Sequence, residues 1–323
     1  MKFKKISRKM LCCILPVIII MMAVVIVFSM NSSVNITETM NADRMERALG
    51  EQEGLINENL SSVSNMAITI ADIVETSKTQ MPIDAYLNML GNIITDNDMV
   101  NGSGLWFEPN VFDENEKYFG PYVYKDGDEM VTTYDYSNAE YDYFSQEYYT
   151  MCETAEGPQF TDPYYDETSG TVMSTCAMPI YFDDEYAGCV TVDITLGTIT
   201  EIVDAIQIGD NGAAMMVTGS GVYMAGVEED VIMAAANITE DENSSLAKAG
   251  SKIIENESGT TSYTSGKSKI NIYYDTLSQT GWKLMITMPQ SELNESLNHM
   301  VIVLVIIAVI AIIVAVFIVL FLV

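Results

Sequence analysis

Two long segments without charge, one near each end, constrain this chain more than any other feature. Residues 10–30 and 300–323 contain no Asp, Glu, Lys, Arg or His, and aliphatic side chains dominate both. About 20 apolar residues at a rise of about 1.5 Å each cross a hydrocarbon core about 30 Å thick. Both segments are therefore predicted to be transmembrane helices, the first at 10–30 and the second at 300–323.

Each segment has an alternative interpretation. The first could be the apolar part of a signal peptide, but it exceeds the roughly 7–15 residues typical of such parts, and the following FSMNSS is a poor cleavage site. The second could be a buried helix of a soluble protein, but its length and uniform apolar composition favour a membrane span.

Charge gives the expected orientation of the two helices. Residues 1–9 carry five Lys or Arg and no acid, and short basic flanks stay in the cytoplasm. We therefore expect a two-pass protein of the plasma membrane, with residues 1–9 and the C-terminus in the cytoplasm and residues 31–298 outside the cell.

The segment between the spans is strongly acidic, because it holds all 45 Asp and Glu residues and only 10 Lys and Arg, a formal charge of −35. Such a surface repels nucleic acid, which we exclude as a partner. It attracts cations, including protonated amines, although solubility is the commoner reason for an acidic surface. Disorder, the other reading of an acidic bias, is disfavoured by abundant Tyr, Ile, Val and Met with strand-like alternation.

The sequence indicates no metal site and no cofactor. The single histidine, His299, lies at a membrane edge, and no Cys or His spacing suits zinc or histidine-based catalysis. The acidic residues 240–242 lack the alternating ligands of a calcium loop. In a hairpin around 183–186, Cys189 falls opposite a residue near Ile180, not opposite Cys176. We therefore interpret the cysteines between the spans, Cys152, Cys176 and Cys189, as small buried apolar residues.

A long helix is predicted over residues 31–79. Apolar residues recur there at steps of three and four and form one stripe: Leu49, Ile56, Leu60, Val63, Ala67, Ile70 and Val74. We expect its upper part to pack on its own domain and its lower part to be a stalk that pairs in a homodimer.

Two sheet-forming modules are predicted to follow. The first, 81–208, has a helix at 83–95, strand-like runs SGLWFEP, GPYVYKDG and EMVTTYDY, a hairpin of 171–182 with 187–194, and a helix at 196–206. The second, 209–289, has short strands at 213–218 and 222–224, a helical or looped stretch at 231–249, a helix at 251–257, and strands at 260–264, 269–275 and 282–288. A helix at 290–298 then leads into the second span. The fold class expected is α+β.

Three runs resemble one known family. They are GLWFEPNVFDENEKYFGPYVYKDG at 104–127, GPQFTDPYYDETSGTVMSTCAMPIYFDDEYAGCVTVDITL at 157–196, and TGWKLMITMPQSEL at 280–293. Together they are similar to the double Cache domain, the extracytoplasmic sensor of bacterial transmembrane receptors, most like methyl-accepting chemotaxis proteins. The resemblance implies two PAS-like antiparallel-sheet modules on a long N-terminal helix, flanked by two transmembrane helices, with the ligand in the membrane-distal module.

The resemblance also implies a set of ligand-binding residues: Tyr141, Gln146, Tyr148, Tyr149, Tyr164, Asp166 and Asp193. In the amino-acid-binding members of the family, an Arg and a Trp hold the ligand carboxylate, and here Gln146 and Tyr148 stand at those positions. The residues implied to hold the ligand ammonium, Asp193 among them, match the family pattern. The implied site therefore keeps its ammonium half and departs in its carboxylate half.

The chemistry of residues 141–193 favours the same ligand class. Asp166 and Asp193 would accept charge-assisted hydrogen bonds from an amine, and tyrosine ring faces attract cations. The stretch has no Lys or Arg to pair with a carboxylate. Each residue has an alternative: Asp193 could cap the helix at 196–206, Asp166 could be a turn residue, and the tyrosines could be core. Trp106 could be core or could line the pocket.

We therefore predict the ligand-sensing region of a transmembrane chemoreceptor, without enzymatic activity, that binds a small amine-bearing or amino-acid-like molecule. Its cytoplasmic signalling partners would act through a C-terminal module absent from this sequence. The alternatives are the sensor region of a histidine kinase or diguanylate cyclase, a membrane-tethered enzyme, and an adhesive surface protein. No nucleophile elbow or set of metal ligands supports the enzyme.

Overall fold

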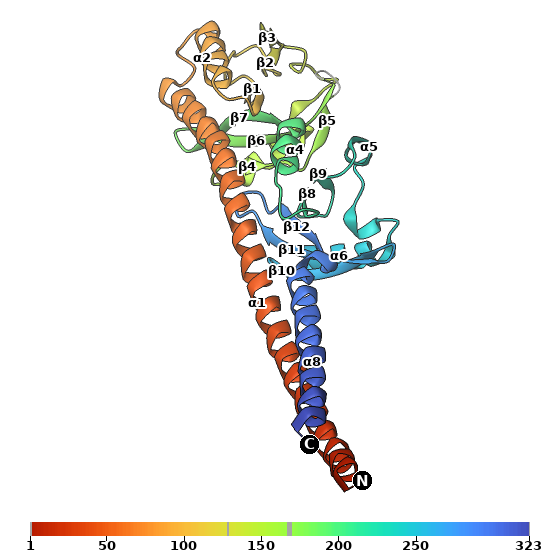
Figure 1. The fold of residues 1–323 in the computed structure, drawn as a ribbon. Coiled ribbons are helices and arrows are strands. Elements are labelled where there is room, and N and C mark those ends of the chain that lie inside the picture. The colour runs from red at the N-terminus through yellow and green to blue at the C-terminus, as the bar shows by residue number, and fades with distance from the viewer. Residues whose placement is uncertain (1, 128, 167–169, 323) are drawn as a thin grey trace.

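A computed structural model describes residues 2–127, 129–166 and 170–322. One helix, α1 (Lys2–Ser77), runs the length of the molecule and passes along two antiparallel sheets (Figure 1). The predicted α+β fold, with a long N-terminal helix and antiparallel sheets, is confirmed. The predicted apolar stripe is confirmed too, because all seven of its side chains are buried against the domain.

The first sheet has strand order β3-β2-β1-β7-β6-β4, and β5 also pairs with β6. Its strands are β1 (Val100–Phe107), β2 (Tyr122–Asp126), β3 (Glu129–Thr133), β4 (Gln159–Phe160), β5 (Tyr164–Asp166), β6 (Thr171–Phe182) and β7 (Glu185–Thr195). Helices α1 and α2 (Ile83–Thr95) cover one face, and the short helices η1 (Tyr143–Ser145), α3 (Glu147–Thr150) and η2 (Cys152–Thr154) lie against the other.

Strand alternation assigns each residue of the central strands to one of these faces. On β7, Val190, Val192 and Ile194 join the core against α1, whereas Cys189 packs in the aromatic cluster of the opposite face. In the hairpin of β6 and β7, Cys189 pairs with Pro179 and Gly188 with Ile180, as predicted. The three cysteines between the spans are buried and unbridged, which confirms their interpretation as small core residues.

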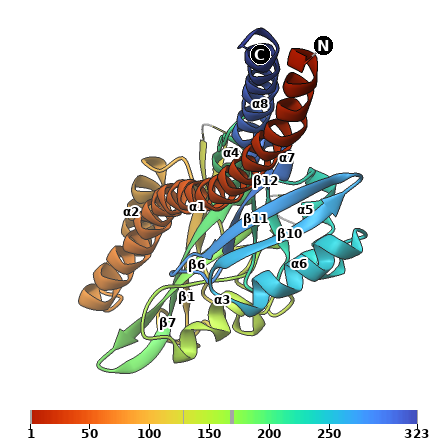
Figure 2. The same ribbon diagram turned by 60° about the horizontal axis from the view of Figure 1, so that its bottom comes forward.

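The second sheet has strand order β10-β11-β12-β8-β9. Its strands are β8 (Ala213–Val217), β9 (Tyr223–Ala225), β10 (Gly259–Ser265), β11 (Ser268–Thr276) and β12 (Lys283–Pro289). Helix α1 lies over one face and α6 (Ser244–Glu255) over the other (Figure 2). The stretch expected to be helical or looped at 231–249 begins inside α5 (Glu229–Met233) and contains η3 (Ile238–Glu240). Helix α6 starts within it and ends at Glu255, inside the helix expected at 251–257.

Helix α4 (Leu196–Asp204) and a short linker connect the two sheets. The linker is held by Glu292 of α7 (Gln290–Leu293), whose carboxylate accepts hydrogen bonds from the main-chain N–H of Asp210 (2.7 Å) and of Asn211 (3.0 Å). These bonds lower the pKa of Glu292. The Asn41 side chain of α1 donates to the Leu293 carbonyl at 2.8 Å, so α1, the linker and α7 meet at one point.

Helix α8 (Glu295–Leu322) follows α7 and lies beside α1, so both ends of the chain leave the domain on the same side (Figure 1). Among the described residues, Ile19–Ser77 of α1 is long and apolar enough to cross a membrane. The apolar part of α8 that meets the same test of composition is shorter, at Asn298–Val314. The second membrane span therefore stays a prediction.

Candidate functional site

The face of the first sheet opposite α1 carries a cluster of aromatic rings centred on Trp106. The rings of Tyr148, Tyr143, Tyr136 and Tyr122 lie 5.1, 5.4, 6.0 and 6.3 Å from the Trp106 ring, centroid to centroid. Such pairs add about 0.5–1.5 kcal/mol each beyond the burial of their surface. The cluster is therefore a continuous aromatic wall built from β1, β2, α3 and the segment between β3 and α3.

Glycines make room for these rings. A Cβ atom at Gly104 would lie 2.7 Å from the Trp106 ring, and one at Gly120 would lie 2.5 Å from it. A Cβ atom at Gly102 would lie 2.1 Å from the Tyr122 hydroxyl oxygen. Because real Cβ contacts are longer than this, any side chain at these positions would displace a ring. The sequence NGSGLW thus combines a large ring with the space that it needs.

A small cavity lies between the rings and the ends of β5 and β7. Its lining residues come from five strands and the adjoining loops: Trp106, Tyr122, Tyr136, Tyr141, Tyr148, Tyr164, Asp166, Met173, Thr191 and Asp193. No Lys or Arg is among them. The free volume is about 10 Å³, roughly the space that one water molecule requires. Ligand sites usually enclose about 300–1,000 Å³, so a ligand must displace some of the rings.

Asp193 is the most buried charge-bearing residue of this cavity, with 4% of its surface exposed. It lies opposite Gly102 on β1 and Thr175 on β6. The Thr175 hydroxyl donates to Asp193 Oδ1 at 2.6 Å, and the Tyr164 hydroxyl lies 2.7 Å from that of Thr175. Since Thr175 gives its one proton to the carboxylate, Tyr164 is the donor in the second bond. Burial raises the pKa of Asp193 to about 6, although the Thr175 hydrogen bond opposes the shift.

The Tyr122 hydroxyl faces Asp193 but forms no hydrogen bond of good geometry with any residue that the structure describes. Burial beside Asp193 also raises the pKa of Tyr122 well above its ordinary value. Tyr122 thus adds a buried hydroxyl beside Asp193 to the lining of the cavity.

Asp166 forms the second acidic part of the lining. The Tyr136 hydroxyl donates to Asp166 Oδ1 at 3.4 Å. Across the cavity, the Tyr148 hydroxyl donates to the Tyr141 hydroxyl at 3.3 Å. Burial raises the pKa of Tyr141 to about 12, so this phenol is neutral at physiological pH. The site thus holds two carboxyl groups among neutral phenols.

The structure brings together five of the seven residues predicted for the site, namely Tyr141, Tyr148, Tyr164, Asp166 and Asp193. The other two lie elsewhere. Gln146 precedes α3, where its Nε2 donates to the Tyr141 carbonyl at 3.1 Å. Tyr149 is fully buried and donates to Glu108 Oε1 at 2.7 Å.

The alternative role of Asp193 as a helix cap is not what the structure shows. Thr195 occupies the N-cap position of α4, whereas Asp193 lies inside β7 and faces the cavity. Trp106 is both core and lining. Tyr122 and Tyr136 were missed by the sequence reasoning, although alternation along GPYVY places Tyr122 on the same face as its neighbour Gly104.

Comparison with known proteins identifies the family of this module. Residues 86–201 match the family model described as the first PDC sensor domain of methyl-accepting chemotaxis protein-like proteins. The matched module thus resembles the sensor domains of chemoreceptors. The resemblance to a Cache-type sensor is thereby confirmed, and the aromatic cavity lies within the matched module.

The curated relatives match part of this chain. The methyl-accepting chemotaxis protein PscA of Pseudomonas syringae pv. tomato is 27% identical over 121 residues, which are 38% of this chain and 19% of PscA. The chain thus spans about a fifth of the length of the curated relatives that it matches.

Solved sensor domains share the fold over most of the chain. The extracellular domain assigned to the histidine kinase mmHK1S-Z3 superposes with a TM-score of 0.68 at 23% identity, covering 80% of this chain and 97% of that domain. The ligand-binding domain of the Pseudomonas fluorescens chemoreceptor CtaA, solved with L-serine, superposes with a TM-score of 0.58 at 15% identity, covering 79% and 99%. At these identities the likeness concerns the fold alone.

Proposed function

We propose that this chain is the ligand-sensing region of a transmembrane chemoreceptor that binds a small amine-bearing molecule in its membrane-distal module. Residues 81–208 would form that module and residues 209–289 the membrane-proximal one. The kinship of residues 86–201 to chemoreceptor sensor domains supports this assignment. The sensor region of a histidine kinase is the second candidate, because such a domain gives the higher TM-score of the two structures compared above.

The proposed topology follows from the charge and hydropathy of the chain. Residues 10–30 and 300–323 would cross the plasma membrane, 1–9 would stay in the cytoplasm, and 31–298 would lie outside. The segment of α1 that is apolar enough to span a membrane supports the first of these spans. A homodimer and cytoplasmic signalling partners complete the proposal.

The observation that carries the ligand proposal is the composition of the aromatic cavity. It contains two carboxyl groups and several ring faces, and no Lys or Arg lines it. An ammonium group would receive charge-assisted hydrogen bonds from Asp193 and Asp166, about 1.5–3 kcal/mol each, and cation–π attraction from the rings. A bare carboxylate would meet two carboxyl groups without a cation, which opposes its burial.

Binding would require the aromatic wall to open. The free volume of about 10 Å³ is too small for an amine larger than water. Tyr141 and Tyr148 are joined through their hydroxyl groups and stand on the short segment around α3, and we propose that this segment moves when the ligand binds. Its displacement would favour one of two arrangements of the domain relative to α1, and the membrane helices would carry that preference to the cytoplasm.

The test uses a pair of ligands that differ by one carboxylate. Isothermal titration on the full chain in detergent would compare ethanolamine with L-serine, of which ethanolamine is the decarboxylated form. Ethanolamine should bind more tightly, and Asp193→Asn should weaken its binding by about 10–150-fold, the equivalent of 1.5–3 kcal/mol. Asp184→Asn is the matched control, because Asp184 is exposed at the tip of the same hairpin.

Either of two results would refute the amine proposal. One is tighter binding of L-serine, or of a dicarboxylate, than of ethanolamine. The other is equal binding of ethanolamine by the Asp193→Asn and Asp184→Asn proteins. Tight binding of an amino acid would leave the sensor assignment in place and overturn the ligand class.

A further inference from the structure

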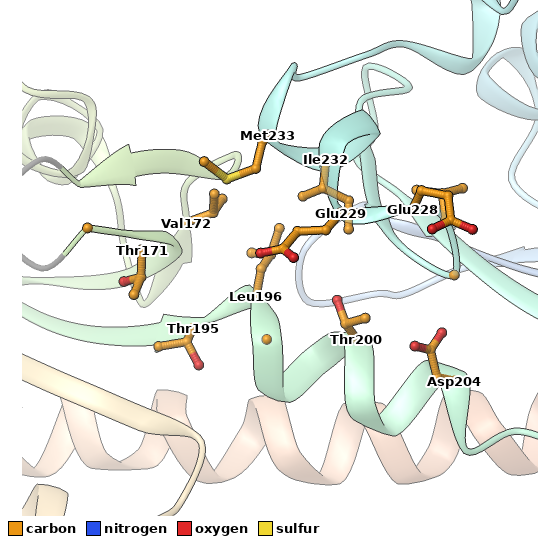
Figure 3. A pocket seen from close by; sticks show the side chains of 14 residues that line it. Thr171, Val172, Thr195, Leu196, Thr200, Asp204, Glu228, Glu229, Ile232 and Met233 are labelled. Carbon is orange, nitrogen blue, oxygen red and sulfur yellow. The ribbon is translucent and has the colours of Figure 1, made fainter. Parts of the chain in front are cut away.

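A second cavity lies away from the aromatic site, between the two sheets. Its volume is about 760 Å³. Its walls come from four segments: the start of β6, the length of α4, the turn after β9, and α5 (Figure 3). None of its lining residues lines the aromatic cavity. We call this space the inter-sheet cleft.

The cleft combines apolar and acidic side chains. Val172, Leu196, Ile232 and Met233 form its apolar surface, and Met233 is 52% exposed. Figure 3 shows Asp204 and Thr200 on α4 directed toward Glu228 and Glu229 on the opposite wall. No Lys or Arg is among the lining residues, so the three carboxylates have no cation within the described walls of the cleft.

Local backbone structure holds these walls in place. Gly226 has a φ of +78°, and a Cβ atom there would lie 2.2 Å from the Ala214 carbonyl oxygen. Only glycine suits such a turn, and the turn places Glu228 and Glu229 over the cleft. On the other side, the Thr200 hydroxyl donates to the Met224 carbonyl at 3.4 Å and ties α4 to β9.

The carboxylates are spread along the cleft rather than gathered at one point. The described residues contain no group of three or more Asp, Glu, His or Cys side chains close enough to hold one metal ion. Apolar side chains lie between the acidic ones. A ligand complementary to this pattern carries ammonium groups separated by methylene segments, because the charges would meet carboxylates and the methylenes would meet Leu196 and Ile232.

We propose that the inter-sheet cleft is a second ligand site, which takes an aliphatic diamine or polyamine. The cleft is open and needs no ring displacement, unlike the aromatic cavity. Its ligand would touch α4 and α5 together and fix the distance between the two sheets. The proposal does not rest on the ligand assigned to the aromatic cavity.

The experiment measures spermidine binding to the full chain by isothermal titration in 0.15 M salt. The Asp193→Asn substitution is present throughout, so that the aromatic cavity contributes little. In this background, adding Glu228→Gln and Glu229→Gln should weaken spermidine binding at least tenfold. The matched control adds Glu114→Gln and Glu116→Gln, two exposed acids of a distant loop, and should change the affinity less than twofold. The control is needed because an acidic surface attracts any polyamine.

Hydrogen exchange gives a second measurement that needs no cleft variant. Spermidine should slow amide exchange in 196–204 and 226–233 of the Asp193→Asn protein, and leave 259–276 unchanged. Equal weakening by both pairs of substitutions would overturn the proposal, since it would mean attraction to the surface as a whole. Unchanged exchange at saturating spermidine would also overturn it, even if the cleft variant failed to fold.

Discussion

Replacing Asp193 by Asn separates the stability of the sensor module from its ligand binding. The carboxyl group is buried, and burial raises its pKa from 3.8 to about 6. The folded chain therefore binds the Asp193 proton more tightly than the unfolded chain does. The stabilising effect of that proton is complete below pH 4 and is lost as the pH rises through about 6.

The size of the effect follows from the shift in pKa. Each unit corresponds to about 1.4 kcal/mol, so at pH 8 ionisation of Asp193 costs the folded state about 3 kcal/mol. About half of this cost develops between pH 5 and pH 8. Asn has nearly the same shape and accepts a hydrogen bond from Thr175, but does not ionise. Relative to Asp193→Asn, the wild type should lose between about 1 and 2 kcal/mol of unfolding free energy over that range.

Trp106 provides the assay, because its ring lies in the cavity wall. The chain has two tryptophans, and a Trp282→Phe background leaves Trp106 as the single reporter. Denaturant unfolding followed by its fluorescence at pH 5, 6, 7 and 8 gives the free-energy difference between the two proteins at each pH. Effects of the other titrating groups cancel in this difference.

The result that would refute the reasoning is a difference that stays constant within about 0.3 kcal/mol from pH 5 to pH 8. It would mean that the Asp193 carboxyl is solvated in the folded chain, and the buried ammonium site would then lose its physical basis. If the free-energy difference between the two proteins grows with pH and the variant binds ethanolamine weakly, the burial of the Asp193 carboxyl and the ammonium site are both supported.

Three further predictions concern the same module and its connection to α8. Ethanolamine affinity should fall about tenfold per pH unit below pH 5, because the ammonium must displace the proton of Asp193, whose pKa is about 6. Isothermal titrations at pH 4, 5 and 7 measure this dependence, and an affinity that does not change with pH would contradict it. Gly188→Ala places a Cβ 2.0 Å from the Trp106 carbonyl oxygen at a φ of +138°. It should lower the free energy of unfolding by about 3 kcal/mol and the melting temperature by roughly 6–12 °C. The control Gly157→Ala, whose added Cβ would have nothing within 4 Å, should leave both nearly unchanged. Glu292→Gln should speed amide exchange at Asp210 and Asn211 about fivefold at pH 7 by weakening their hydrogen bonds; unchanged exchange there would show that Glu292 does not hold the linker.

Much of the fold could be predicted because its signals are local. The stripe from Leu49 to Val74 has helical period, and each of its residues is buried on α1. The hairpin around 183–186 was predictable in outline, since a short turn largely sets the register of both strands. A register shift between Ile180 and Tyr181 then places Pro179, next to the expected Ile180, opposite Cys189. Helix α2 was predicted at its observed bounds, because Pro82 stands directly before its first residue.

The site was only partly predictable, because its residues come from segments that meet in space. Asp193 and Tyr164 lie on strands, whose alternation fixes the face of each side chain. Gln146 and Tyr149 lie in the irregular stretch between β3 and β4, where two short 3-10 helices and one four-residue helix turn the chain repeatedly. Periodicity says nothing about direction in such a stretch. The inter-sheet cleft had no sequence signal, because both sheets must be placed before it exists.

The junction of Asn41, Asp210 and Glu292 has a consequence for how, in the proposed topology, a change in the domain would be transmitted to the membrane helices. Helix α1 packs into the core of both sheets, so the position of each sheet can be described relative to α1. Helix α8 starts just after the junction, and none of its described side chains belongs to that core. A change in the relative position of the two sheets would thus displace α8 along its axis relative to α1. Rotation or translation of the whole domain would not change this relative displacement.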